Sequence, residues 1–250
     1  MNVVFLGSNY NPISIHCLQG LLSSGTVAVL VGVDNQARGG FAKMFLTGAR
    51  RYGPVSFSFR IAGHILDRLI RKIPFVARRK GPGSVKEICK TKGIECVDIT
   101  DVNGQDTIER FRQFRPDILA VANFSQILRR EILELAPGGC INFHPSLLPA
   151  YRGPVPLYWM KKNGETRGGG TIHFLSEELD SGDIVLQRSF SMSPRDSDTS
   201  LLTRSAELGA TLMAEAVRMF EKGDVPRVQQ NETLASYYPF PKGKRTETKR

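Results

Sequence analysis

The sequence predicts an α/β fold in which helices cover both faces of a mostly parallel, seven-stranded sheet. Seven short apolar runs recur along the chain, and segments with helical periodicity lie between most of them. Strands that alternate with helices in this way form parallel sheets, because each helix returns the chain to the edge where the previous strand began. The 250 residues are 41% hydrophobic, which is enough for one well-buried core, so we expect one domain.

The predicted strands are the apolar runs at residues 3–6, 27–33, 94–97, 118–122, 140–143, 171–175 and 184–190. Helices are predicted at 105–114, at 128–135 after a turn at 123–126, and at 199–220. The first run leads into Gly7 and the start of a helix, as in nucleotide-binding folds. It lacks the three-glycine fingerprint, so the sequence does not predict a dinucleotide site.

A candidate active site lies where the predicted strand at 140–143 ends. Asn142 and His144 are two positions apart, so on an extended strand their side chains share one face. Pro145 excludes the helical conformation from His144, so the chain leaves the sheet there as an extended turn. Ligands bind at this edge of open α/β sheets. We therefore expect an amide and an imidazole to converge on one small substrate.

A second polar segment follows the predicted strand at 171–175. Residues 176–183 carry four carboxylates and a glycine, a composition that could bind a metal, cap a helix or supply a partner for a histidine. The spacing lacks the alternating ligands and the closing glutamate of a calcium loop, so we expect no metal. His173, two residues after Thr171, points either into the cleft or onto the face of the sheet as a structural residue.

Together these motifs resemble those of the formyltransferases that use 10-formyltetrahydrofolate. The resemblance is carried by Asn142-x-His144, Ser146-Leu147-Leu148-Pro149, Arg152-Gly153 and Leu179-Asp180-Ser181-Gly182-Asp183-Ile184, with Asp180 thirty-six positions after His144. It implies a Rossmann-like formyltransferase fold with Asn142, His144 and Asp180 as the catalytic residues. It also implies a catalytic domain at 1–225 and a C-terminal extension at 226–250, which we expect to be partly disordered.

The three residue types suit formyl transfer. An amine that attacks the formyl carbon turns the formyl oxygen into an oxyanion, which needs preorganised hydrogen-bond donors. Asn142 offers an amide hydrogen, and protonated His144 offers a charged donor. Asp180 would accept from the other ring nitrogen and fix its tautomer. Asp180, or His144 once neutral, would then take the excess proton from the amine, so neither a metal nor a covalent nucleophile is required.

The resemblance also implies a binding site for 10-formyltetrahydrofolate as the formyl donor. In the family, backbone groups of the turn after the fourth strand hold the pterin ring, and the Ser-Leu-Leu-Pro segment lines the same cleft. The residues assigned to the cofactor are Gln126, Ile127, Leu128, Ser146, Leu147, Leu148 and Pro149. From the residues alone, the four aliphatic members of this set are equally compatible with an ordinary hydrophobic core.

Residues 38–80 form a basic insertion relative to that family. They contain eleven lysines and arginines against one acid, so their net charge of +10 equals that of the whole chain. Within them, residues 59–73 have apolar residues at helical spacing and basic residues opposite. Such a helix packs on its own domain or in a dimer, binds an anionic acceptor, or makes peripheral contact with an anionic membrane.

The acceptor amine is left open by the resemblance. The family's initiator-tRNA enzyme usually adds a C-terminal barrel domain, for which too few residues follow the last predicted helix. Residues 234–240 resemble the end of relatives of this length that formylate nucleotide-linked amino sugars. We therefore favour the amino group of a nucleotide-linked amino sugar, whose phosphates would pair with the basic insertion, and we expect a homodimer. Three alternatives remain: a methionyl-tRNA formyltransferase without that domain, a formyltetrahydrofolate hydrolase and a nonenzymatic basic binding module.

Targeting and redox features are sparse. The apolar run at the start is short and follows no basic leader, and no stretch approaches the length of a membrane span. Cys17, Cys89, Cys96 and Cys140 show no Cys-x-x-Cys pair and no zinc spacing, so we expect reduced, buried thiols. These features predict a cytoplasmic protein.

Overall fold

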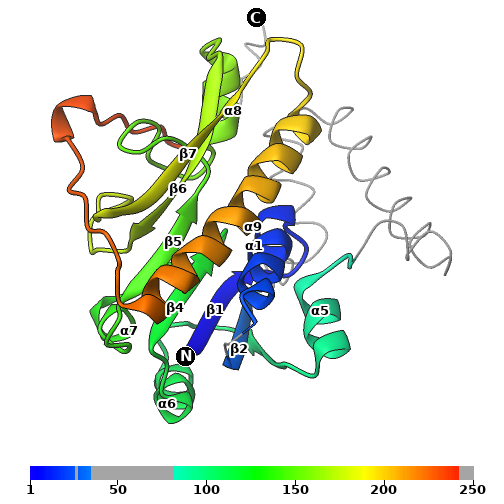
Figure 1. Ribbon diagram of the computed structural model, residues 1–250, viewed down its shortest axis with the longest axis vertical. Helices are drawn as coiled ribbons and strands as arrows, with labels where there is room; N and C mark the ends of the chain where they lie inside the picture. The colour runs from blue at the N-terminus through cyan, green and yellow to red at the C-terminus, as the bar shows by residue number, and fades with distance from the viewer. Residues whose placement is uncertain (26–27, 35–81, 242–250) are drawn as a thin grey trace, which may run out of the picture. The chain divides into compact units, whose positions relative to one another are not determined.

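One seven-stranded sheet organises the residues that the structure describes, which are 1–25, 28–34 and 82–241 of a computed structural model. The strand order is β3-β2-β1-β4-β5-β6-β7 (Figure 1). Strands β3, β2, β1, β4 and β5 run parallel, whereas β6 pairs antiparallel with both β5 and β7. The predicted mostly parallel, seven-stranded sheet is therefore confirmed.

Each predicted strand corresponds to an observed one. The strands are β1 (Asn2–Ser8), β2 (Ala28–Asp34), β3 (Glu95–Ile99), β4 (Ile118–Ala122), β5 (Cys140–His144), β6 (Arg167–Phe174) and β7 (Ile184–Ser191). The helices are α1 (Pro12–Ser23), α5 (Val85–Lys92), α6 (Gln105–Phe114), α7 (Arg130–Leu133), α8 (Pro156–Lys162) and α9 (Asp198–Lys222), followed by the 3-10 helix η2 (Glu232–Leu234).

Only half of the segment predicted as a helix at 128–135 is helical, so that prediction is wrong in its extent. The helix α7 has only four residues, and the chain is extended at Arg129. The backbone N–H of Arg129 donates to the side-chain oxygen of Asn103 at 2.8 Å, and the side chain of Gln126 accepts from the backbone of Val102 at 2.8 Å. These bonds to the loop before α6 hold residues 123–129 out of a helix.

Some predictions fall on parts of the chain that lie outside the described residues. These are the basic insertion at 38–80, its predicted helix at 59–73 and the charged segment from residue 242 onward. The described residues within 1–34 and 84–239 cluster into one compact unit. Among the helices of the described ranges, none combines the length and the apolarity that a membrane span requires. The domain boundary after residue 225 remains a prediction.

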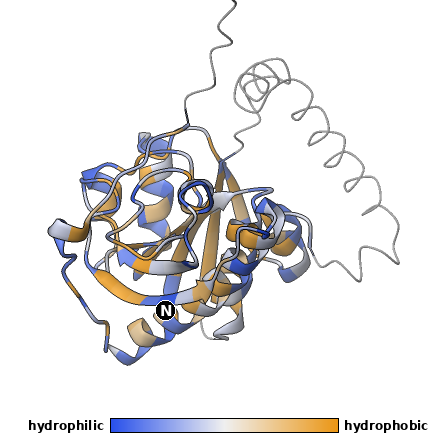
Figure 2. Cartoon of the chain, turned by 90° about the horizontal axis from the view of Figure 1, so that it is seen from above, coloured by the Kyte–Doolittle hydropathy of each residue, from blue (hydrophilic) through white to orange (hydrophobic). Residues whose placement is uncertain are grey.

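The sheet separates two hydrophobic cores. Alternate residues of β1 point to opposite faces: Val3 and Phe5 belong to the core that includes α1, α5 and α9, and Val4 and Leu6 to the core that includes α6 and α7. All four side chains are fully buried. Figure 2 shows hydrophobic colour along the central strands, whereas the surrounding helices and loops carry both hydrophobic and hydrophilic colour. Helices on both faces of the sheet are thus confirmed.

A close contact between α1 and α9 completes the first of these cores. A Cβ atom at Gly20 would stand only 2.0 Å from the carbonyl oxygen of Ala210, so only glycine allows the two helices to approach this closely. The helix α9 spans 25 residues. The hydroxyl of Ser197 caps its N-terminus, and Gly223, in the left-handed conformation, caps its C-terminus.

Gly20→Ala tests this contact. In an open helix the change would stabilise the chain by up to about 1 kcal/mol through helix propensity. Here the added methyl group overlaps backbone that cannot move aside easily, so we expect a net loss of about 1–3 kcal/mol in the free energy of unfolding. The measurement is urea unfolding of the purified protein. Gln19→Ala on the same helix serves as the control, and a Gly20→Ala protein as stable as the wild type would contradict the tight packing.

Candidate active site

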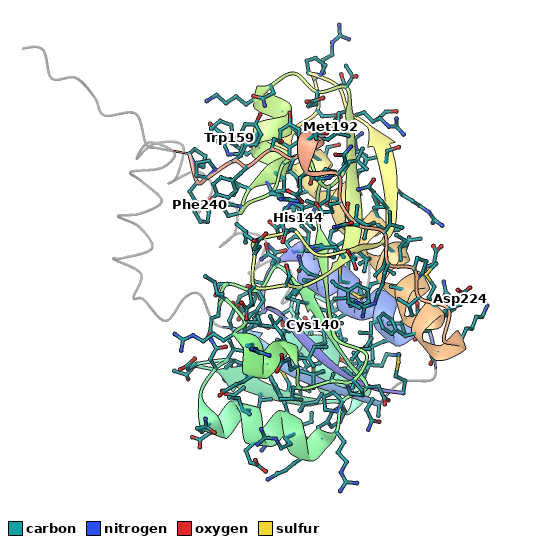
Figure 3. The ribbon with its side chains drawn as sticks, turned by 90° about the vertical axis from the view of Figure 1, so that its left-hand side faces the viewer. Cys140, His144, Trp159, Met192, Asp224 and Phe240 are labelled. Atoms are coloured by element: carbon teal, nitrogen blue, oxygen red, sulfur yellow. The ribbon has the colours of Figure 1, made fainter. Side chains whose placement is uncertain are left out.

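The candidate active site lies between the end of β5, the neighbouring strand β6 and the loop after β6. Pairing of β5 with β6 sets Asn142 opposite His173. The loop returns Asp180 to them, with Oδ2 at 3.7 Å from Nδ1 of His144 and Oδ1 at 3.8 Å from Nε2 of His173. Figure 3 shows His144 in the interior, amid side chains of several elements. The three predicted catalytic residues are therefore brought together.

His144 is held by the loop that follows it. Its Nε2–H donates to the carbonyl oxygen of Tyr151 at 2.8 Å, which leaves Nδ1 facing the carboxylate of Asp180. That carboxylate accepts from the backbone N–H of Gly153 at 2.8 Å through the same oxygen. Asp180 therefore faces one ring nitrogen, as predicted, but the other nitrogen, which was predicted to face the formyl oxygen, is bonded to a backbone carbonyl. The 3.7 Å contact between Nδ1 of His144 and Oδ2 of Asp180 is an ion pair only when the imidazole is protonated.

An uncommon backbone conformation at Tyr151 directs its carbonyl toward His144. Tyr151 has a φ of 62°, in the left-handed region that bulky residues rarely adopt, at a cost on the order of 1–3 kcal/mol. Its ring stacks on Tyr238 at 4.9 Å, and its hydroxyl donates to the carboxylate of Glu165. Burial and this bond raise the pKa of the Tyr151 phenol to about 12, so it stays a donor. Side-chain contacts thus hold the strained residue in place.

His173 fixes the orientation of the Asn142 amide. Its Nδ1–H donates to the carbonyl of Phe174 at 2.8 Å, so Nε2 carries the lone pair and accepts from Nδ2 of Asn142 at 3.1 Å. Complete burial, and secondly the nearby ring of His144, lower the pKa of His173 to about 4. The neutral ring leaves Asn142 with a second amide hydrogen for a substrate oxygen. Of the two predicted positions, His173 therefore occupies the one in the site.

The Ser-Leu-Leu-Pro turn is held by β6 and β7. The hydroxyl of Thr171 donates to the carbonyl of Ser146 at 2.7 Å and accepts from the backbone N–H of Leu148 at 3.2 Å. The side-chain amide of Gln187 donates to the carbonyl of Leu148 and to Thr171, both at 2.8 Å. Ser146 and Leu148 are buried by this packing. Their side chains therefore shape the turn from within.

The other two residues of that turn are more accessible. Leu147 is half-buried and lines an open depression with Arg167, Gln187, Arg188 and Ser189. Pro149 is half-buried, and its carbonyl accepts from the backbone of Ser236 at 3.2 Å. The structure thus assigns no common face to the four residues predicted to bind the cofactor here.

Residues 126–128, the other predicted cofactor segment, are divided between core and surface. The side chain of Gln126 is committed to the backbone of Val102, and Leu128 is buried in the second core. Ile127 is 80% exposed, so the core interpretation is wrong for it and correct for Leu128. The carbonyl of Ile127 accepts from the side chain of Asn103 at 2.9 Å.

Sequence reasoning missed one buried carboxylate at the same edge of the sheet. Asp34 ends β2 and is 3% exposed. It accepts from the hydroxyl of Ser8 and from the backbone N–H of Ser125, both at 2.6 Å. It therefore joins the ends of β1 and β2 to the loop that follows β4. An aspartate directly after an apolar strand is the signal that could have revealed it.

The described part of the chain contains no cluster of three histidine, cysteine or acidic residues arranged to hold a metal ion. In the same residues, Cys17, Cys89 and Cys140 are buried free thiols, as expected, whereas Cys96 is half-buried. Burial raises the pKa of the Cys17 and Cys140 thiols, which keeps them protonated and inert.

Comparison with protein families finds one matching family, described as formyl transferase, over residues 73–217. This span is more than half of the 250 residues and includes Asn142, His144 and Asp180. The methionyl-tRNA formyltransferase of Syntrophus aciditrophicus is 44% identical over 133 residues, which are 53% of this chain and 43% of the relative. The chain thus spans about half the length of the curated relatives it matches.

Solved structures share the fold at low sequence identity. The N-formyltransferase of Helicobacter canadensis, solved with folinic acid and dTDP-3-aminofucose, has a TM-score of 0.63 at 17% identity and covers 96% of this chain and 71% of its own. Glycinamide ribonucleotide transformylase 1 of Symbiobacterium toebii has a TM-score of 0.63 at 18% identity, and the match covers 92% of this chain and 94% of that protein. Identities this low support the fold alone.

Replacing the buried histidine should reduce the acid sensitivity of folding. The pKa of His173 lies at about 4 in the folded protein, below its ordinary value of 6.5. Between these two values the unfolded chain binds a proton that the folded protein does not. The contribution of neutral His173 to the free energy of unfolding is therefore fully present above pH 6.5 and is lost as the pH falls toward 4. His173→Gln should show a shallower loss of unfolding free energy across this window, measured with urea.

His16→Gln on α1, outside the site, should keep the wild-type slope. Identical slopes for the wild type and His173→Gln would show that His173 is not buried in its neutral form.

Proposed function

Because the chain belongs to the formyl transferase family, we propose that it transfers the formyl group of 10-formyltetrahydrofolate to a primary amine. The observation that carries this proposal is the convergence of Asn142, His144 and Asp180 from β5 and the loop after β6. An amide donor, an imidazole and a carboxylate are the groups that acyl transfer to an amine uses. The folinic acid in a solved structure of the same fold supports a folate donor.

In the proposed reaction, the amine attacks the formyl carbon and the formyl oxygen takes up the negative charge. Asn142 donates its second amide hydrogen to this oxygen, because the first is bonded to His173. Protonated His144, beside Asp180, adds positive charge next to the oxyanion. The bond between the formyl carbon and N10 of the folate then breaks. The excess proton of the amine passes through Asp180 or water to N10, so charge and protons balance.

The donor is assigned to the turns at 126–128 and 146–149 by resemblance to the family. The side chains of Gln126, Ser146 and Leu148 are engaged in bonds or packing within the protein, so backbone groups of the two turns are the expected folate contacts. Ile127 is the one of the three residues at 126–128 whose side chain is largely exposed, which makes it the available apolar contact there.

Two acceptors are candidates. A nucleotide-linked amino sugar is supported by the similarity of fold to an N-formyltransferase solved with dTDP-3-aminofucose. Methionyl-tRNA is supported by sequence, since relatives named methionyl-tRNA formyltransferase are 34–44% identical over the matched residues. The similarity in sequence is the stronger of the two supports. The predicted homodimer and the predicted membrane contact of 59–73 remain predictions.

The acceptor is determined by following release of tetrahydrofolate from 10-formyltetrahydrofolate by absorbance. Parallel reactions contain water alone, dTDP-linked amino sugars, or methionyl initiator tRNA. We expect release only when an amine acceptor is present. Release with water alone would make the protein a hydrolase, and no release with any acceptor would support a nonenzymatic binding module.

Substitutions at the three central residues should abolish or greatly slow transfer. Asn142→Ala removes one oxyanion donor and should lower kcat on the order of 100-fold or more. His144→Ala and Asp180→Asn should reduce transfer to the background rate, because each removes one member of the pair formed by His144 and Asp180. Single-turnover formation of the formylated amine measures the chemical step directly.

Asp183→Asn is the matched control for Asp180→Asn, since it makes the same chemical change three positions away in the same loop. It should retain the wild-type rate. Urea unfolding of every variant separates lost chemistry from lost folding. Wild-type rates in His144→Ala or Asp180→Asn would exclude this mechanism.

A further inference from the structure

The segment that follows α9 connects the two loops of the site. After α9 the chain turns back, and residues 225–239, here called the return segment, pass along the side of the sheet formed by β6 and β7 (Figure 1, orange to red). The segment contains the short helix η2. It bonds both to the loop that carries Asp180 and to the loop that follows His144.

The return segment fixes the backbone of the Asp180 loop. Val228 and Ile184 exchange two backbone hydrogen bonds, of 2.8 and 3.0 Å. Gln230, which is 5% exposed, donates both hydrogens of its side-chain amide, one to the carbonyl of Asp180 and one to the carbonyl of Gly182, each at 2.8 Å. Asp180 has a φ of 52°, in the left-handed region, so an external bond to its carbonyl selects a conformation that the chain would otherwise seldom adopt.

The same side chain also fixes the loop after His144. The amide oxygen of Gln230 accepts from Nη2 of Arg152 at 2.8 Å, and the carboxylate of Glu232 accepts from Arg152 at 2.7 and 2.9 Å. The hydroxyl of Ser236 accepts from the backbone of Tyr151 at 2.9 Å. Tyr151 also supplies the carbonyl that accepts from His144, and Gly153, two residues later, donates to Asp180.

We propose that Gln230 is a positioning residue that sets the Asp180 carboxylate against His144. The side-chain amide of Gln230 uses both of its hydrogens and its oxygen. The hydrogens are donated to two carbonyls of the Asp180 loop, and the oxygen accepts from Arg152. Gly153, which binds the carboxylate, follows Arg152 directly. One buried amide therefore bonds to both loops that hold His144 and Asp180 at their separation of 3.7 Å. The role in catalysis rests on the function proposed above.

The first test compares Gln230→Leu, Gln230→Glu and Gln229→Leu. Leucine removes all three bonds, whereas glutamate keeps the acceptor for Arg152 but cannot donate to the two carbonyls. Gln229 is the exposed neighbour, so its replacement by leucine is the matched control. Since a displacement of reacting groups by 1 Å can cost about 100-fold, we expect both Gln230 variants to lower kcat by about 10- to 100-fold with little change in KM for the formyl donor.

A merely structural role would lower the amount of folded enzyme without changing the chemistry of the folded fraction. The pH profile of kcat distinguishes the two, because a displaced carboxylate alters how the pair of His144 and Asp180 titrates. We expect the acid limb of the profile to move in both Gln230 variants and to stay in place in Gln229→Leu. An unchanged profile and kcat in Gln230→Glu would overturn the proposal.

A second measurement does not depend on activity. The backbone N–H of Gly153 donates to Asp180, so its resonance in a nitrogen–proton correlation spectrum reports that bond. Gln230→Leu should shift this resonance and speed its hydrogen exchange, and Gln229→Leu should leave both unchanged. An unmoved Gly153 resonance in Gln230→Leu would refute the positioning role. If the wild type transfers no formyl group to any acceptor, the proposed function fails, while this spectrum still decides whether Gln230 holds Asp180.

Glu232→Ala provides a variant for the case in which both Gln230 variants fail to fold. The Glu232 carboxylate is largely exposed, so its loss loosens Arg152 without emptying a buried position. A shift of the Gly153 resonance in this variant would support the connection between the return segment and the carboxylate, and an unchanged resonance would contradict it.

Discussion

The antiparallel register between β5 and β6 is the constraint on which the site depends. It sets His173 beside Asn142, and it sets Thr171 beside His144, where its hydroxyl holds the turn that follows. A slip of one residue would turn His173 and Thr171 to the other face of the sheet and leave Asn142 without its partner. The parallel strands alone could not provide this arrangement, because the histidine that orients the amide arrives on the strand that runs in the opposite direction.

Burial then fixes where each proton lies. A buried polar group without a partner is unfavourable by about 1–3 kcal/mol, so each side chain in the site takes the tautomer and rotamer that its neighbours allow. The carbonyl of Phe174 accepts from Nδ1–H of His173, which leaves Nε2 as an acceptor toward Asn142, and the carbonyl of Tyr151 accepts from Nε2–H of His144. Left-handed backbone at Tyr151 and Asp180 is tolerated because hydrogen bonds from other segments hold both residues. Both the backbone strain and the positions of the protons therefore depend on loops that other segments of the chain hold in place.

Much of the fold and the centre of the site could be predicted from sequence, because both depend on local signals. Apolar runs identified the strands, and the pair Asn142 and His144 at a strand end predicted where the candidate site lies. The predicted helix at 128–135 was too long because side-chain bonds to Asn103 and Val102, distant in sequence, compete with local propensity. Gln230 and Asp34 were missed for a related reason. Each acts through backbone groups of loops that only the folded chain brings near, and no local pattern records such a partner.

The contact of Gly20 with Ala210 also has a consequence for how the chain is made. Protein synthesis proceeds from the N-terminus, so α1 leaves the ribosome long before α9 exists to cover it. Until then the part of α1 that packs on α9, which includes Cys17 and Gly20, has no permanent cover. Contacts between residues this far apart in sequence form slowly, and the exposed surface invites aggregation in the interval. We therefore expect nascent chains that stop short of α9 to be clients of chaperones, and the core to close only when the last long helix is complete.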